Sequence, residues 1–187
     1  VPICCRPLAD RFERQNVLFI GIDWERKGGP ELLQAFARLR ARCTSATLTI
    51  VGCYPRTRVP GVQVVGAVPA ERISDYLARA TVFCMPSWRE PFGIVYLEAM
   101  RAGLPVIAWD LGAVPDLIRD GENGYRVKAG DIDGLARRLE DLITSPERCR
   151  KMGECGQAIV SSRFTWDAVQ QRMWTTLREN LCQILPD

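Results

Sequence analysis

Short apolar stretches alternate with longer amphipathic segments along this chain. Continuous apolar stretches of a few residues predict buried strands at residues 17–22, 46–52, 62–65, 81–85, 104–109 and 125–127. Apolar residues that recur every three to four positions predict helices at residues 32–40, 70–80, 92–101, 131–144, 146–162 and 165–185. Turns rich in glycine, proline and asparagine separate several of these elements, as at residues 28–30, 110–115 and 120–124.

This alternation of strands and helices indicates an α/β fold. The strands are continuously apolar, which is typical of a parallel sheet that is buried on both faces. We therefore predict a Rossmann-like parallel sheet flanked by helices on both faces. Ligands of such folds lie beyond the carboxyl ends of the strands, and Gly21, Gly52, Met85 and Asp110 lie at those ends.

No internal repeat, low-complexity tract or linker divides the chain. We expect residues 1–187 to form a single Rossmann-like domain, with residues 165–185 as its C-terminal helix. That helix carries an apolar stripe formed by Trp166, Val169, Met173, Trp174 and Leu177. We favour ordinary core packing of the stripe over contact with another domain or another copy of the chain.

The composition of the chain excludes several classes of function. The 187 residues are 47% hydrophobic, which is enough for one well-packed domain. The net charge of +3 is spread along the chain rather than concentrated in a stripe, so no nucleic-acid partner is expected. The sequence has no His, which excludes a Ser-His-Asp triad, an imidazole base and a His-ligated zinc within it.

The cysteines and the hydropathy suggest a location. None of the 8 Cys residues forms a C-x-x-C pair, and we favour reduced cysteines over a disulfide framework. No apolar run approaches the roughly 20 residues that span a bilayer, and no signal peptide is visible. A cytoplasmic protein is the expectation.

Two acids in residues 86–100 carry the most informative candidate chemistry. Glu90 lies in a loop broken by proline and glycine, and Glu98 lies about two turns into the helix that the loop opens. The N–H groups at such a helix start favour a phosphate, and a carboxylate on each side can bind the hydroxyls of a sugar and a ribose. This suggests a nucleotide-sugar binder. The alternative is a solvated Glu90 and a Glu98 that is exposed or paired with Arg101 or Lys27.

Lys27 is the candidate cation for the phosphates. It follows the first predicted strand and directly precedes Gly28 and Gly29, which open a helix. A lysine there can meet a diphosphate as a point charge while backbone amides bind the oxygens. Neither a Walker A loop nor G-x-G-x-x-G is present, which argues against a standard dinucleotide cofactor. On spacing alone, a solvated lysine beside a turn is an equal alternative.

Several short segments of the sequence, taken together and in their order along the chain, resemble a known family. The segment from Val17 to Arg163, about four-fifths of the chain, resembles the nucleotide-sugar-binding half of retaining glycosyltransferases of the GT-B fold, the glycosyl transferases group 1 family. The acid pair alone is a weak signal, but it is specific when embedded in this order. The blocks that carry the resemblance are residues 17–28, 48–52, 64–66, 86–100, 103–107 and 120–125.

The resemblance implies a role for each candidate. Lys27 would neutralise the donor diphosphate and Glu90 would bind hydroxyls of the transferred sugar, which makes these two the catalytic candidates. Glu98 would bind the ribose hydroxyls. The backbone amides of residues 92–94 would bind the sugar or phosphate, and the turn at residues 66–68 would line the base pocket. The further donor-binding candidates are therefore Gly21, Gly66, Val68, Phe92, Gly93 and Ile94.

One position departs from the family pattern. Members usually carry an Arg directly after the first-strand glycine, where this chain has Ile22. Arg26, next to Lys27, is a candidate replacement and is added to the donor-binding set. Loss of a guanidinium would weaken stabilisation of the departing diphosphate, so reduced activity or an altered donor geometry is expected.

The half of the fold that binds the acceptor is missing, and the chain begins with Val1 rather than Met. We therefore expect an excised C-terminal domain whose N-terminal acceptor domain is absent. An acceptor glycan or lipid, and any peripheral membrane contact, would belong to that missing half.

The implied activity of the full-length protein is retaining transfer of a sugar from a nucleoside diphosphate to an acceptor hydroxyl, with the isolated domain inactive. No metal and no cofactor are expected besides the nucleotide-sugar substrate. The alternatives are a sugar-nucleotide epimerase of the GT-B type, and a nucleotide-binding or interaction module whose catalysis has decayed, with Ile22 as the trace.

Overall fold

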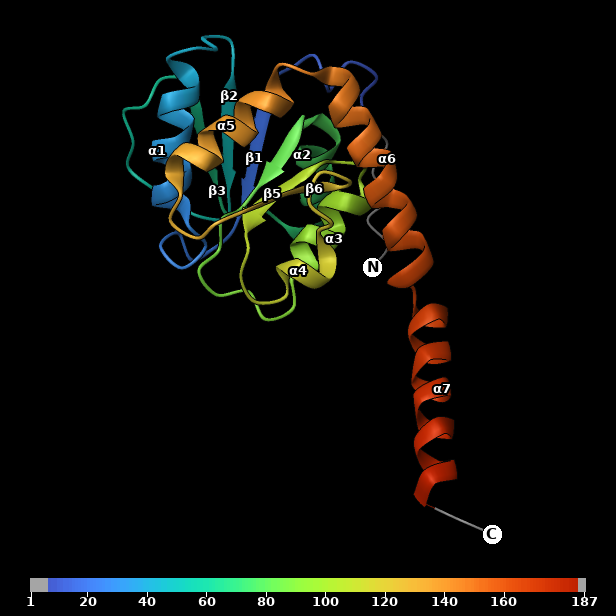
Figure 1. Cartoon of the computed structure of the whole chain (residues 1–187). Helices are drawn as coiled ribbons and strands as arrows, with labels where there is room; N and C mark the ends of the chain where they lie inside the picture. The colour runs from blue at the N-terminus through green and yellow to red at the C-terminus, as the bar shows by residue number, and fades with distance from the viewer. Residues whose placement is uncertain (1–6, 185–187) are drawn as a thin grey trace.

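The computed structural model describes residues 7–184. A six-stranded, fully parallel sheet forms its centre, in the order β3-β2-β1-β4-β5-β6. This confirms the predicted fold class (Figure 1). The strand order changes direction between β1 and β4, and ligands of open α/β sheets bind at such a switch point. The strands are β1 (Asn16–Ile20), β2 (Thr47–Val51), β3 (Val62–Gly66), β4 (Val82–Cys84), β5 (Val106–Trp109) and β6 (Gly124–Val127).

Helices cover the two faces of the sheet. In Figure 1, α1 and α5 lie side by side over one face, and α2, α3 and α4 lie on the other. The longer α6 packs against α3 and α5 at one side of the domain. The helices are α1 (Gly29–Arg40), α2 (Ile73–Arg79) preceded by the short 3₁₀ turn η1 (Ala70–Arg72), α3 (Ile94–Arg101), α4 (Val114–Leu117), α5 (Ile132–Ile143), α6 (Pro146–Arg163) and α7 (Trp166–Ile184).

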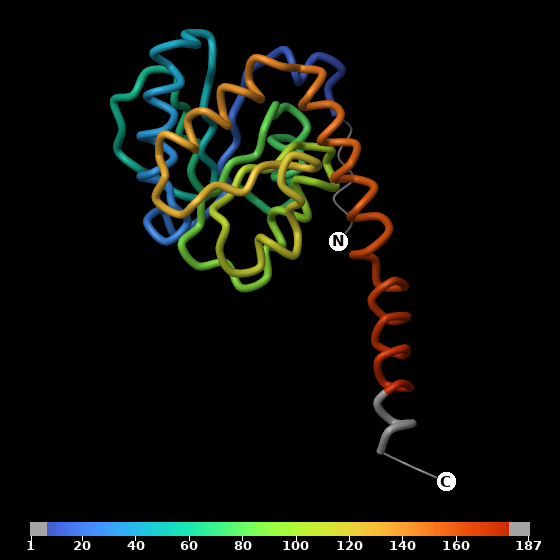
Figure 2. Tube along the Cα trace, in the orientation of Figure 1, coloured from blue at the N-terminus to red at the C-terminus, as the bar shows by residue number. Residues whose placement is uncertain are grey.

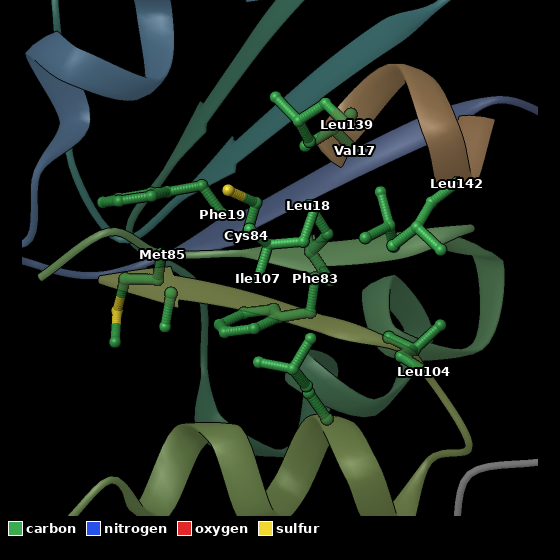
Figure 3. Close-up of a cluster of buried hydrophobic side chains, with 14 of the residues drawn as sticks. Val17, Leu18, Phe19, Phe83, Cys84, Met85, Leu104, Ile107, Leu139 and Leu142 are labelled. Atoms are coloured by element: carbon green, nitrogen blue, oxygen red, sulfur yellow. The ribbon is translucent and has the colours of Figure 1, made fainter. Parts of the chain in front are cut away.

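The core fills both sides of the sheet because every central strand is apolar. Figure 3 shows Leu139 and Leu142 of α5 above the sheet near Val17, whereas the ring of Phe83 points to the opposite side. There the Phe83 ring meets the ring of Tyr96 on α3 edge-on, with centroids 5.9 Å apart. This contact fixes α3, and with it the loop that carries Glu90, against the end of β4.

Two element boundaries differ from the sequence prediction. The helix expected from residue 92 begins at Ile94, because Gly93 adopts a left-handed conformation with φ of 68°. Glu98 is therefore one turn into α3 rather than two. The segment expected to be only a turn, residues 110–115, contains the start of α4, where Pro115 occupies the first helical turn.

The expected core packing of the C-terminal helix is wrong. In Figures 1 and 2, α7 extends from the end of α6 away from the body of the domain. Trp166 is 88% exposed, and the side chains of Met173, Trp174 and Leu177 are exposed as well. Helical periodicity identified the apolar stripe correctly, but periodicity does not say what covers such a stripe.

The described cysteines agree with the prediction of reduced thiols. Cys43, Cys53, Cys84, Cys149 and Cys155 are all free. Cys4, Cys5 and the side chain of Cys182 lie outside what the structure describes. Burial raises the pKa of Cys53 to about 11, which keeps this thiol protonated near neutral pH. None of the helices described in the structure is long and apolar enough to cross a membrane.

Candidate active site

The structure brings Lys27 and Glu90 together, although they are 63 residues apart in the sequence. Lys27 Nζ lies 2.5 Å from Glu90 Oε2, and the Glu90 side chain is only 8% exposed. The second carboxylate oxygen, Oε1, accepts a hydrogen bond of 3.2 Å from the backbone N–H of Gly93. The acid is thus held between a cation and the start of α3.

Two loops meet to form this pair, and a glycine permits their close approach. Lys27 closes a turn in which its N–H bonds the carbonyl of Asp23, and Gly28 follows with φ of 73°. A Cβ at Gly28 would lie 1.8 Å from the carbonyl oxygen of Pro86. Any larger residue would therefore separate the loop after β1 from the loop after β4.

Arg26 joins the same two loops. Its Nε lies 2.8 Å from Asp23 Oδ2, and its Nη1 donates to the carbonyl of Arg89 at 3.1 Å. Its own carbonyl accepts a hydrogen bond from the N–H of Trp88. Backbone and side-chain hydrogen bonds from Arg26 lower the pKa of Asp23. Arg26 therefore holds the segment directly before Glu90, and its guanidinium is already bonded to Asp23 and to the carbonyl of Arg89.

Glu98 lies one turn into α3, on the side of the helix that also carries Ile94. It is half-buried, and this burial raises the pKa of its carboxyl group. The structure gives that carboxyl group no hydrogen-bond or ion-pair partner among residues 7–184, so the suggested pairing with Arg101 or Lys27 is not formed. The helical rise puts Glu98 about 8 Å along the axis from Gly93.

The amides at the start of α3 are used unequally. The Gly93 N–H donates to Glu90 Oε1, so a ligand would have to displace that hydrogen bond to use it. The neighbouring N–H groups of Phe92 and Ile94 have no acceptor among the described residues, and both side chains are exposed. Two backbone donors thus remain open beside the Lys27–Glu90 pair.

The remaining candidates lie along the same edge of the sheet. Gly21 follows β1 and lies against the Lys27 side chain, since a Cβ on Gly21 would be 3.1 Å from Lys27 Cγ. Ile22, directly after Gly21, is 83% exposed. Gly66 ends β3 with φ of 79°, and Val68 is half-buried just beyond it.

Sequence reasoning missed one residue at this edge. Tyr54 follows β2 and lies directly against Gly66, and it is exposed despite its size. The available signal was its position: an aromatic residue two places after a strand-ending glycine faces the ligand edge of a parallel sheet.

Comparison with known proteins places the chain in a family. The family model described as "Glycosyl transferases group 1" matches residues 14–145. The chain belongs to this family. This match confirms the resemblance to the group 1 family that the sequence analysis described.

A curated relative is the GDP-mannose-dependent alpha-(1-6)-phosphatidylinositol monomannoside mannosyltransferase of Mycolicibacterium smegmatis. It is 32% identical over 159 residues, which cover 75% of this chain and 42% of the relative. The group 1 domain thus spans less than half the length of that relative.

Solved structures share the fold. Alr3699/HepE of Anabaena in complex with UDP and glucose superposes with a TM-score of 0.76 at 26% identity, covering 89% of this chain and 48% of HepE. The C-terminal domain of the group 1 family protein LpcC from Francisella tularensis gives a TM-score of 0.75 at 22% identity. The match covers 86% of this chain and 95% of the LpcC domain.

Proposed function

We propose that this chain is the donor-binding domain of a glycosyltransferase that transfers a sugar, with retention, from a nucleoside diphosphate to an acceptor hydroxyl. The observation that carries the proposal is the Lys27–Glu90 pair at the start of α3. The HepE structure, which holds UDP and glucose, and the GDP-mannose dependence of the mycobacterial relative support a nucleotide sugar as the ligand.

In this proposal Lys27 and the open amides of Phe92 and Ile94 bind the diphosphate. Negative charge grows on the diphosphate as the bond to the sugar breaks, and fixed donors at that place stabilise the transition state. The aligned peptide dipoles of α3 add to the same effect. A lysine and backbone amides supply this charge, so we propose transfer without a metal or a further cofactor.

Glu90 is proposed to bind the transferred sugar. An ionised carboxylate has about four acceptor positions, and two are taken by Lys27 and Gly93. The others can accept sugar hydroxyls. Both existing contacts hold the carboxylate in place before the donor arrives, which reduces the cost of ordering it on binding.

Glu98 is proposed to bind the ribose. Its carboxyl group is half-buried and unpaired among the described residues, and vicinal hydroxyls would provide the missing donors. Gly21 and the turn at Gly66 and Val68 complete the edge along which the nucleoside lies.

Arg26 is proposed to compensate for Ile22 indirectly. Its guanidinium already bonds Asp23 and the carbonyl of Arg89, so it positions the loop of Glu90 and adds positive charge near the diphosphate. The acceptor, which we propose to be a glycan or a lipid, would be bound by another domain of the full-length protein. We propose a cytoplasmic location, with any membrane contact made by that other domain.

The Ile at position 22, where an Arg is usual, also favours a second candidate, a nucleotide-binding module that has lost catalysis. Both candidate functions require the donor site, but only the glycosyltransferase transfers the sugar. Sugar transfer by the full-length protein, measured with the nucleotide sugar that this domain binds, separates them.

Calorimetric titration of the chain with UDP, GDP, ADP and their sugars tests the proposal. We expect at least one nucleoside diphosphate to bind, and Lys27→Ala to weaken that binding roughly 10- to 100-fold, because a charge-assisted contact is worth about 1.5–3 kcal/mol. Lys151→Ala is the matched control, since the ion pair between Lys151 and Glu147 lies on α6. A folded chain that binds none of these ligands would refute the donor-site proposal.

A further inference from the structure

An exposed aromatic ring stands at the carboxyl end of β2. Tyr54 is 71% exposed, although a tyrosine carries a large apolar ring. It belongs to the loop that leaves the sheet immediately beside β1, the strand that leads to Lys27. None of the contacts proposed above involves this ring.

The ring is nevertheless held in place. A Cβ on Gly66 would lie 1.9 Å from a ring carbon of Tyr54, so the ring rests directly on the glycine backbone. The Tyr54 hydroxyl oxygen accepts a hydrogen bond of 3.1 Å from the N–H of Ala67. A ring that is fixed along one side and mostly exposed presents an open aromatic surface at low entropic cost.

Close backbone contacts connect this surface with the diphosphate site. The N–H of Gly52 bonds the carbonyl of Gly66 at 2.7 Å. A Cβ on Gly52 would lie 2.7 Å from the carbonyl oxygen of Gly21, and Gly21 in turn lies against Lys27. Neighbouring strands are about 4.8 Å apart, so the ends of β3 and β1 are separated by roughly two strand spacings.

We propose that Tyr54 is the platform on which the nucleobase of the donor stacks. The inference rests on the proposed donor site, and it specifies how the base is recognised. Tyr54 already occupies the Ala67 N–H, a backbone donor of the turn expected to line the base pocket. Recognition at this turn therefore relies on the π-face of the base, which every base has, rather than on a hydrogen bond from Ala67.

Three forms of the chain test the platform: the unaltered protein, Tyr54→Phe and Tyr54→Ala. Each is titrated with the nucleoside diphosphate that the unaltered chain binds best, and with inorganic pyrophosphate, which has no base. Stacking on an aromatic side chain is worth about 1–3 kcal/mol per base, so Tyr54→Ala should weaken nucleotide binding roughly 5- to 150-fold. Tyr54→Phe keeps the ring and should stay within about threefold. Pyrophosphate should bind all three forms equally.

The results separate failure of the platform from failure of the donor site. Unchanged nucleotide binding by Tyr54→Ala would overturn the platform and leave the donor site intact. Equal loss in Tyr54→Phe and Tyr54→Ala would assign the effect to the hydroxyl and would also overturn it. The platform would also be overturned if Tyr54→Ala lost as much affinity for pyrophosphate as for the nucleotide. Failure of the unaltered chain to bind any nucleoside diphosphate would overturn both proposals.

Discussion

Glu98 shows how a single half-buried acidic residue can lower the stability of the folded chain. Its carboxyl group is half-buried and has no partner among the described residues, and burial raises its pKa above the usual value of 4.5. Burial of an unpaired carboxylate costs free energy. A ligand that supplies hydroxyl donors would offset this cost, so the residue has a physical reason to favour the bound state.

The raised pKa of Glu98 predicts a pH-dependent stability. Between pH 4.5 and its pKa in the folded state, the folded chain binds more protons at this group than the unfolded chain does. Its contribution to stability therefore falls as pH rises through that window. Glu98→Gln should be more stable than the unaltered chain at pH 7 and equally stable at pH 4, as measured by thermal unfolding.

The same variant should weaken ligand binding. Glu98→Gln is expected to lower affinity for a ribonucleoside diphosphate and to have a smaller effect on its 2′-deoxy analogue, because the deoxy form lacks one proposed partner hydroxyl. Glu154→Gln on the exposed side of α6 is the control. Equal losses for both nucleotides would remove Glu98 from the ribose site.

At the scale of elements, the site depends on how closely two loops approach each other. Gly28 lies against the carbonyl of Pro86, and Arg26 bonds the carbonyl of Arg89. These contacts connect the loops after β1 and β4, the strands between which the sheet order changes direction. The Lys27–Glu90 pair is a consequence of that approach.

Gly28→Ala should therefore damage both stability and binding. Gly121→Ala is the matched control, because Gly121 has φ of 79° but no atom within 4 Å of its Cβ position. The control carries only the backbone strain of about 1–2 kcal/mol. Gly28→Ala adds a clash at 1.8 Å, so its unfolding free energy in urea should fall further and its nucleotide affinity should drop. Equal stability losses in the two variants would show that the loops tolerate separation.

At the scale of the whole molecule, we expect changes in α7 and in the sheet core to have opposite consequences for stability. Figure 2 shows α7 extending from the body, and Trp166, Met173, Trp174 and Leu177 on it are exposed. Deletion of the chain from Trp166 onward should therefore leave the thermal midpoint of the domain nearly unchanged. Phe83→Ala, by contrast, removes a fully buried ring and should cost about 3–5 kcal/mol. A large loss of stability on deletion would mean that α7 packs on the body in solution.

The strands were predictable because each is a continuous apolar run, and the parallel sheet followed from their alternation with helices. The left-handed conformation of Gly93 at the start of α3 was not predictable, because glycine permits several conformations and the surroundings select one. The sequence also did not reveal that Arg26 bonds Arg89, because this contact depends on how distant loops meet. The exposure of α7 was missed for a related reason: an apolar stripe does not identify its partner.

A crystal structure of the chain with the nucleotide sugar selected by the titrations tests the central claim most directly. The account predicts that the diphosphate lies about 3 Å from Lys27 Nζ and from the amide of Ile94, within hydrogen-bond distance, with the sugar hydroxyls on Glu90. A nucleotide bound elsewhere, with the Lys27–Glu90 pair untouched, would contradict it.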